Sequence, residues 1–189
     1  MQTNEHQQPV TFSAKKVISV VMTAMNPGML AKAKLEGYPW PVAFVVSGLA
    51  FALFFLQIGI ELYRAGNSSM LAVFGWVGVG IIYGTLGVCF LSVTIWSFSK
   101  LFKGKHALTW TLQAFALSYA PTLVYVVLGL IANLIWGWNT ALVFGVTGVL
   151  WALIPLRMVI YELVEGKGMA GIFLTTICGV IVLFSWVWL

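Results

Sequence analysis

The residues that could support catalysis are few in this sequence. Its two histidines, His6 and His106, have no cysteine or carboxylate neighbours at the spacing of a metal site. There is no aspartate and no G-x-S-x-G motif, so an Asp-oriented serine triad is excluded. The glycine-rich stretch GWVGVG at 75–80 lacks the spacing of a dinucleotide-binding loop and lies in an apolar run. These residues therefore predict no metal site, no serine hydrolase site and no phosphate-binding loop.

Polar side chains inside apolar stretches are the next candidates for function, because such groups are costly in hydrocarbon and tend to face other helices or a cavity. Glu61 follows Gln57 by one helical turn and precedes Arg64 by three residues, a spacing that predicts an ion pair at the membrane interface. Gln113 and Asn133 lie near the two ends of one apolar segment, which favours a structural role for both.

Arg157 lies in the stretch LIPLRMVIYELVEG, just after Pro155. Its side chain can extend to the membrane surface or pair with Glu162. Alternatively, Pro155 opens the helix backbone and Arg157 holds an acidic lipid headgroup or the carboxylate of a partner protein. The sequence leaves both interpretations open.

Pro121 interrupts another apolar run, in the stretch SYAPTLVYVVLGL. Proline lacks a backbone N–H, so a kink is predicted there, with the proline facing other helices that can satisfy the freed carbonyl near Leu117. A hydroxyl of Ser118 or Thr94 is expected to compensate for the lost bond. Tyr119 is expected to point into the bundle or toward a partner.

The elements that position these residues follow from composition. Of the 189 residues, 61% are hydrophobic and 8% are charged, far fewer charges than the surface of a soluble domain carries. The net charge of +5 is too dispersed to form a nucleic-acid-binding face. The chain is therefore predicted to be an integral membrane protein that binds no nucleic acid.

Apolar stretches long enough to cross a bilayer occur in five places, which predicts an all-α bundle of five transmembrane helices. The predicted crossings form one domain over 41–189, and their approximate ranges are 41–62, 71–97, 108–136, 139–161 and 169–189.

Lysines in the connections predict the orientation of these crossings, because basic residues collect on the cytoplasmic side. Arg64 is the basic residue on the opposite side, so the N-terminus is expected in the cytoplasm and the C-terminus outside. The lysines on the cytoplasmic side are Lys15, Lys16, Lys32, Lys34, Lys100, Lys103, Lys105 and Lys167.

Residues 1–40 are predicted to form a short cytoplasmic segment before the first crossing. Within it, the pattern of residues 10–25 predicts an amphipathic helix on the membrane surface, with Lys15 and Lys16 facing anionic lipids. The turn signal NPG at 26–28 is expected to end this helix.

Glycine spacing predicts close helix packing in the second crossing. Gly80 and Gly84 form a small-x-x-x-small pair, which lets a neighbouring backbone approach. Gly145 and Gly148 in the fourth crossing are either the partner surface or unrelated to it. The cysteines, Cys89 and Cys178, lie far apart in apolar runs and are expected to pack without forming a disulfide.

Two stretches carry a resemblance to a known family: WSFSKLFKGKHALTWTLQAFALSYAP at 96–121 and LWALIPLRMVIYELVEGKGMAGIFL at 150–174. The order and spacing of these motifs are similar to those of the Yip family of Ypt/Rab-interacting membrane proteins. Over about 20–189 the chain resembles the short prokaryotic members of that family. The resemblance implies a protein of the bacterial inner membrane that organises other membrane components. It also implies that the protein is not an enzyme and has no cofactor, metal or catalytic residues. Its expected partners are other integral membrane proteins, anionic lipids and a second copy of the chain.

Three classes of function remain open at this point. A scaffold or assembly factor fits the compact set of helices and the resemblance. A transporter, or the membrane subunit of one, would use Pro121 and Pro155 as breaks around a central hydrated cavity lined by Gln113, Tyr119 and Arg157. A lipid-interacting or membrane-shaping protein would use Lys15 and Lys16 at the membrane surface.

Overall fold

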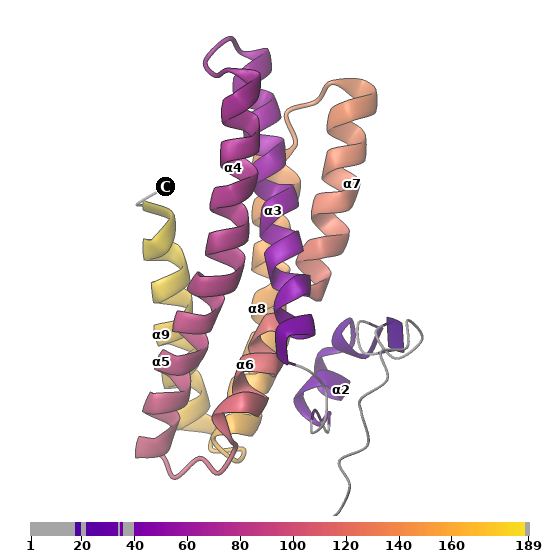
Figure 1. Ribbon diagram of the computed structural model, residues 1–189. Helices are drawn as coiled ribbons and strands as arrows, with labels where there is room; N and C mark the ends of the chain where they lie inside the picture. The colour runs from indigo at the N-terminus through magenta and orange to yellow at the C-terminus, as the bar shows by residue number, and fades with distance from the viewer. Residues whose placement is uncertain (1–17, 20–21, 34, 36–39, 188–189) are drawn as a thin grey trace, which may run out of the picture.

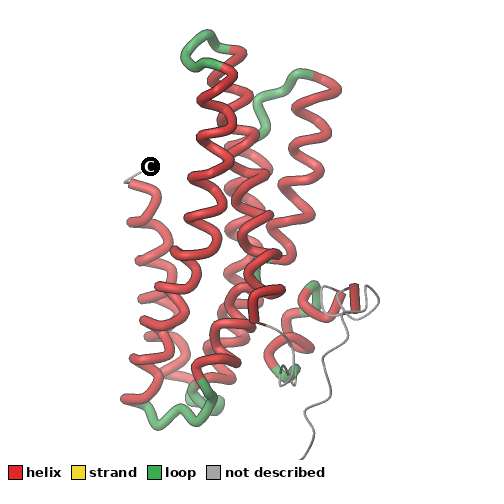
Figure 2. The backbone as a smooth tube through the Cα atoms, viewed as in Figure 1, coloured by secondary structure: helices red, strands yellow, loops and turns green. Residues whose placement is uncertain are grey.

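The computed structural model describes residues 18–19, 22–33, 35 and 40–187. Over these residues the chain is helical, and it forms an elongated bundle with loops at both ends (Figure 2). The predicted surface helix at 10–25, including Lys15 and Lys16, lies largely outside the described residues.

Among the described residues, four helical segments are long and apolar enough to cross a membrane. The first is α3 (Trp40–Arg64), and the second runs without a break through α4 (Met70–Ile82), the π-helical turn η1 (Tyr83–Gly87) and α5 (Val88–Leu101). The third contains α6 (Leu108–Leu117) and α7 (Ala120–Trp136), and the fourth contains the π-helical turn η2 (Ala141–Val146) and α8 (Thr147–Leu163). The chain is therefore an integral membrane protein built as a helical bundle.

A further apolar helix, α9 (Gly168–Val187), follows α8 and packs against α8 and α5 (Figure 1). Its described apolar part, Gly168–Val182, is shorter than the four spanning segments. The fifth crossing, at 169–189, thus stays a prediction. Within the bundle, α3 is the central helix, since α4, α6 and α7 all pack against it.

The backbone of α3 lies close to that of the second segment at two glycines, Gly80 in α4 and Gly84 in η1. A Cβ atom at Gly80 would lie 2.5 Å from the carbonyl oxygen of Phe51, and one at Gly84 would lie 2.6 Å from that of Ser47. Gly145 instead faces the ring of Phe54, and Gly148 faces α7. The surface that meets Gly80 and Gly84 is therefore α3, and the alternative that Gly145 or Gly148 provides it is wrong.

The third segment is interrupted immediately before Pro121. α6 ends at Leu117, and α7 restarts at Ala120, so Pro121 lies in the first turn of a helix, where its missing N–H costs little. Pro121 is buried, as predicted. The prediction that a hydroxyl of Ser118 or Thr94 binds the Leu117 carbonyl is wrong. The Ser118 hydroxyl donates to the carbonyl of Ala114 at 2.7 Å, and the Thr94 hydroxyl donates within its own helix.

Pro155 has a different setting from Pro121. It is buried inside α8, and the helix continues on both sides of it from Thr147 to Leu163. The expected opening of this helix at Pro155 is not seen: α8 is continuous there, and the proline removes only its own backbone N–H from the helix.

A short helix, α2 (Pro27–Ala31), docks the N-terminal segment onto the end of the bundle that carries the α5–α6 and α8–α9 loops (Figure 1). The NPG turn starts this helix, with the Asn26 side chain accepting a hydrogen bond from the backbone N–H of Met29 at 3.3 Å. Leu30 is buried against the bundle, and the indole N–H of Trp110 donates to the carbonyl of Ala33 at 3.2 Å.

Candidate functional site

Polar side chains of three segments meet at the end of the bundle that carries the α3–α4 loop. We call this group the interhelical clamp, and its members are Gln57, Glu61, Arg64, Asn133 and Thr140. It joins α3 to α7 and to the loop before η2. These residues lie far apart in the sequence, so the clamp exists only in the folded bundle.

Asn133 is the centre of the clamp and is fully buried. Its side-chain amide donates to Glu61 Oε1 at 3.2 Å and to the carbonyl of Trp138 at 2.9 Å. Its side-chain oxygen accepts from Arg64 Nη1 at 3.0 Å, and so does its backbone carbonyl. One amide side chain therefore connects a carboxylate, a guanidinium and a loop.

Glu61 holds the start of the fourth segment. The same oxygen, Oε1, accepts hydrogen bonds from the backbone N–H groups of Thr140 and Ala141, the latter at 2.8 Å. These N–H groups lie at the start of a helix, where they have no partner within the helix. A carboxylate at that position also interacts favourably with the helix dipole. Glu61 thus caps the helix that contains η2 and α8.

Gln57 completes the clamp one turn deeper in α3, where it is fully buried. Its amide nitrogen donates to the carbonyl of Val126 at 2.8 Å, and its oxygen lies 3.0 Å from the hydroxyl of Thr140. Gly129 permits this contact, since a Cβ atom there would lie 2.7 Å from the Gln57 oxygen.

The clamp differs from the sequence analysis in one predicted contact and in one contact that was not predicted. The predicted ion pair between Glu61 and Arg64 is absent from the described residues, and both side chains bind Asn133 instead. The sequence interpretation also missed Asn133 as their partner. The signal that could have found it is the polar stripe at 57, 61 and 64, which lies on one face of α3 and needs polar partners on the facing helix.

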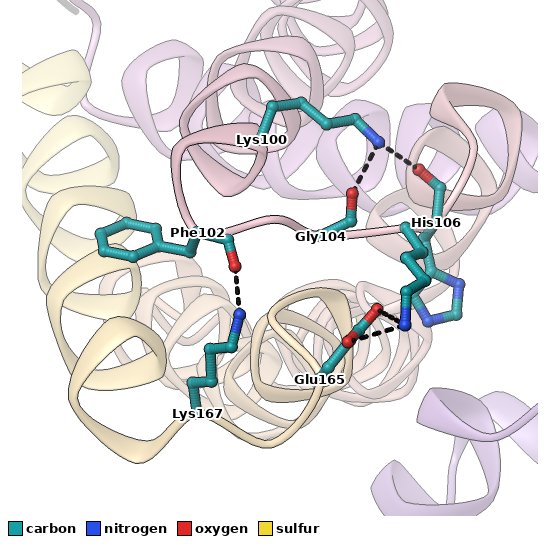
Figure 3. A network of polar contacts seen from close by, with 7 residues as sticks. Lys100, Phe102, Gly104, His106, Glu165 and Lys167 are labelled. Carbon is teal, nitrogen blue, oxygen red and sulfur yellow. Dashed lines mark hydrogen bonds and ion pairs between the residues drawn. The ribbon is translucent and has the colours of Figure 1, made fainter.

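The opposite end of the bundle carries the lysine-rich loops, which bind one another (Figure 3). Lys100 donates to the carbonyls of Gly104 and His106 at 2.9 and 3.0 Å. Lys105 pairs with Glu165 at 3.0 Å, and Lys167 donates to the carbonyl of Phe102. Lys105 and Lys167, two of the lysines that predicted the orientation, therefore also tie the α5–α6 loop to the α8–α9 loop.

Arg157 lies on the exposed face of α8, in a groove of about 550 Å³ between α8 and α9. It forms no ion pair within the described part of the chain, so the expected pairing with Glu162 is not seen. The groove is lined by Leu153, Ile154, Arg157, Met158, Tyr161 and Thr175.

Gln113 and Tyr119 are both buried, by contrast with Arg157. The ring of Tyr119 packs 5.1 Å from that of Phe51, and the tyrosine borders a separate hollow of about 140 Å³ that includes Tyr83. The three residues expected to line one transport cavity therefore diverge, two into the packed core and one onto the lateral surface.

The remaining candidate residues form no described metal site. His106 stacks on Trp110 with ring centroids 4.0 Å apart, and the described residues contain no group of three metal-ligating side chains. Cys89 and Cys178 are free thiols, as predicted. Comparison of the chain with known protein families, curated protein sequences and solved structures finds no match. The fold and the site thus define a helical integral membrane protein and no narrower class.

Proposed function

We propose that this chain is a scaffold or assembly factor of the membrane that is not an enzyme, as its resemblance to the Yip family implies. Its partners in this proposal are other integral membrane proteins, a second copy of the chain or anionic lipids. The observation that supports the proposal is that most polar side chains at membrane depth bind other helices of the bundle. Gln57, Glu61 and Asn133 bind neighbouring helices, whereas Arg157 faces outward. Because its inner polar groups bind one another, such a bundle has its lateral surface left for contacts with other membrane components.

Transport is the weaker alternative for the same reason. A transport route needs polar residues that line a shared path near the middle of the membrane. Gln113 and Tyr119 are packed in the core, and Arg157 lies on the outside of α8.

The scaffold proposal is tested by site-specific photo-crosslinking in intact membranes. A crosslinking amino acid is placed at Phe74 of α4 or at Leu128 of α7, which are 68% and 51% exposed, with the buried Phe51 as control. A scaffold should yield a defined crosslinked membrane protein from one lateral face and none from Phe51. Lipid adducts alone at both exposed positions, together with solute flux in proteoliposomes, would overturn the proposal.

We also propose five crossings, with the N-terminus in the cytoplasm and the C-terminus outside a bacterial inner membrane. The support is the common location of the lysine-rich loops and of α2 at one end of the bundle, while Arg64 and the α3–α4 loop lie at the other (Figure 1).

Cysteine labelling tests this orientation. In a Cys89→Ala, Cys178→Ala background, Ser68→Cys should react with an impermeant maleimide added to spheroplasts, and Lys103→Cys should react only after permeabilisation. Alkaline phosphatase fused to the C-terminus should be active, because that enzyme matures outside the cytoplasm. An inactive fusion alongside the expected labelling would mean that α9 does not cross the membrane.

A further inference from the structure

We propose that the groove between α8 and α9 is a binding site for an anionic phospholipid, with Arg157 binding the headgroup phosphate. The lipid comes from the leaflet next to the lysine-rich loops. This inference rests on the proposed function where that function names anionic lipids as partners, and it assigns the site that would bind one. Because the site requires no protein partner, it can be tested on the purified chain, separately from the crosslinking test of the scaffold.

The first step is that Arg157 lacks an anion within the described chain. It lies six residues before the end of α8 at Leu163, which places its Cα about 9 Å inside the helix end. Glu162 is rotated from Arg157 by about 140° around α8. Glu165 is paired with Lys105 at 3.0 Å. An unpaired charge at membrane depth is costly, and the described residues supply no counter-ion for Arg157, so an anion from the surrounding membrane can fill that role.

The second step is the polar edge of the groove. Tyr161 lies one turn after Arg157 on the same face of α8 and reaches the α8–α9 turn, where a Cβ atom at Gly166 would lie 3.5 Å from its hydroxyl. The flexible stem of Arg157 can extend toward the same level. A guanidinium and a phenol hydroxyl both donate hydrogen bonds, and the planar guanidinium matches phosphate oxygens.

The third step is the apolar wall that lies beside Arg157 and continues toward the membrane centre. Leu153 and Ile154 lie about one turn before Arg157 in α8, and Met158 lies next to it; Ile154 and Met158 are 44% and 46% exposed. This order, with phosphate donors near the loops and an apolar wall beyond them, matches a headgroup followed by an acyl chain. A protein carboxylate would use the donors and leave the wall unexplained.

The fourth step is the charge around the groove. Lys103, Lys105 and Lys167 are exposed in the two loops at this end of the bundle, and a basic membrane-facing surface attracts anionic lipids. Lys105 and Lys167 are already engaged with Glu165 and with the carbonyl of Phe102. In this proposal the charge of these lysines attracts anionic lipid to this end of the bundle, while Arg157 makes the specific contact with the headgroup.

The test is native mass spectrometry of the full-length chain released from nanodiscs that contain equal amounts of phosphatidylglycerol and phosphatidylcholine. We expect the unmodified chain to retain phosphatidylglycerol preferentially. Arg157→Gln should reduce that retention by about tenfold or more, since a charge-assisted contact is lost. Tyr161→Phe should reduce it less. Lys103→Gln is the matched control, because it removes one positive charge at the same end outside the groove, and should retain the lipid.

Two results would overturn the proposal. Equal retention of phosphatidylglycerol by Arg157→Gln and Lys103→Gln would mean that Arg157 only extends to the membrane surface. Equal retention of the two lipids by the unmodified chain would mean that the groove does not select anions. If Arg157→Gln does not fold, Met158→Trp provides the same test by filling the exposed apolar wall while keeping Arg157. That variant should also lose the lipid, and unchanged retention would count against the site.

Discussion

Replacing Asn133 with leucine is expected to lower the melting temperature of the purified chain by roughly 5–15 °C. The substitution removes three side-chain contacts at once, to Glu61, to Arg64 and to the carbonyl of Trp138. Because Asn133 is fully buried, the groups left behind cannot all find water. Unsatisfied groups of this kind cost about 1–3 kcal/mol each, so a total of about 2–4 kcal/mol is expected. Intrinsic tryptophan fluorescence during heating in mild detergent measures the change.

Asn67→Leu is the control for this measurement. Asn67 is exposed in the α3–α4 turn at the same end of the bundle, so its replacement should shift the melting temperature by no more than about 2 °C. A double-mutant cycle with Glu61→Gln adds a second check, because residues in one hydrogen-bond network give non-additive effects. Equal shifts for Asn133→Leu and Asn67→Leu, with additive effects in the cycle, would show that the clamp contributes no stability.

The positions of the long helices could be predicted from sequence, because membrane crossing imposes a direct requirement on the length of an apolar run. The prediction for the third crossing, 108–136, coincides with the helical segment Leu108–Trp136. The other three spanning segments differ from their predicted ranges by a few residues at their ends, where apolar runs give way to interfacial residues.

The clamp could not be predicted in the same way, because it depends on which helices are neighbours. The sequence places Glu61 next to Arg64 along one helix, and that local pairing was the natural expectation. The fold puts α7 against α3, and Asn133 then offers both residues a buried partner. Spacing along one helix shows that a polar face exists, whereas only the packing of helices shows what covers it.

The two prolines show a similar limit. Proline predicts a lost backbone hydrogen bond wherever it occurs, but the consequence depends on whether a helix begins there. At Pro121 the chain ends one helix and starts another, whereas α8 continues through Pro155. The residues before Pro121 include Ser118, whose hydroxyl bonds the carbonyl of Ala114 and supports the end of α6. No comparable local signal distinguishes Pro155.

Gly80→Ala and Gly78→Ala are expected to change stability in opposite directions, although both glycines lie in α4. A Cβ atom at Gly80 would lie 2.5 Å from the carbonyl oxygen of Phe51 and 2.9 Å from the Cα atom of Ala52, and these backbone atoms cannot move aside without separating α3 from α4. We expect a loss of about 2–3 kcal/mol, which corresponds to a melting temperature lower by roughly 4–12 °C. At Gly78 no atom lies within 4 Å of the added Cβ.

Gly78→Ala should therefore gain up to about 1 kcal/mol from the higher helix propensity of alanine. Heating both variants in the same detergent separates the two effects, since each variant replaces one glycine of α4 with alanine and the two have the same composition. A neutral result at Gly80 would mean that α3 and α4 do not pack closely there. A loss at Gly78 in a membrane preparation, together with a gain in detergent, would instead reveal a partner on the outward face of α4. The pair of substitutions thus tests the inner packing of the bundle and the availability of its lateral surface together.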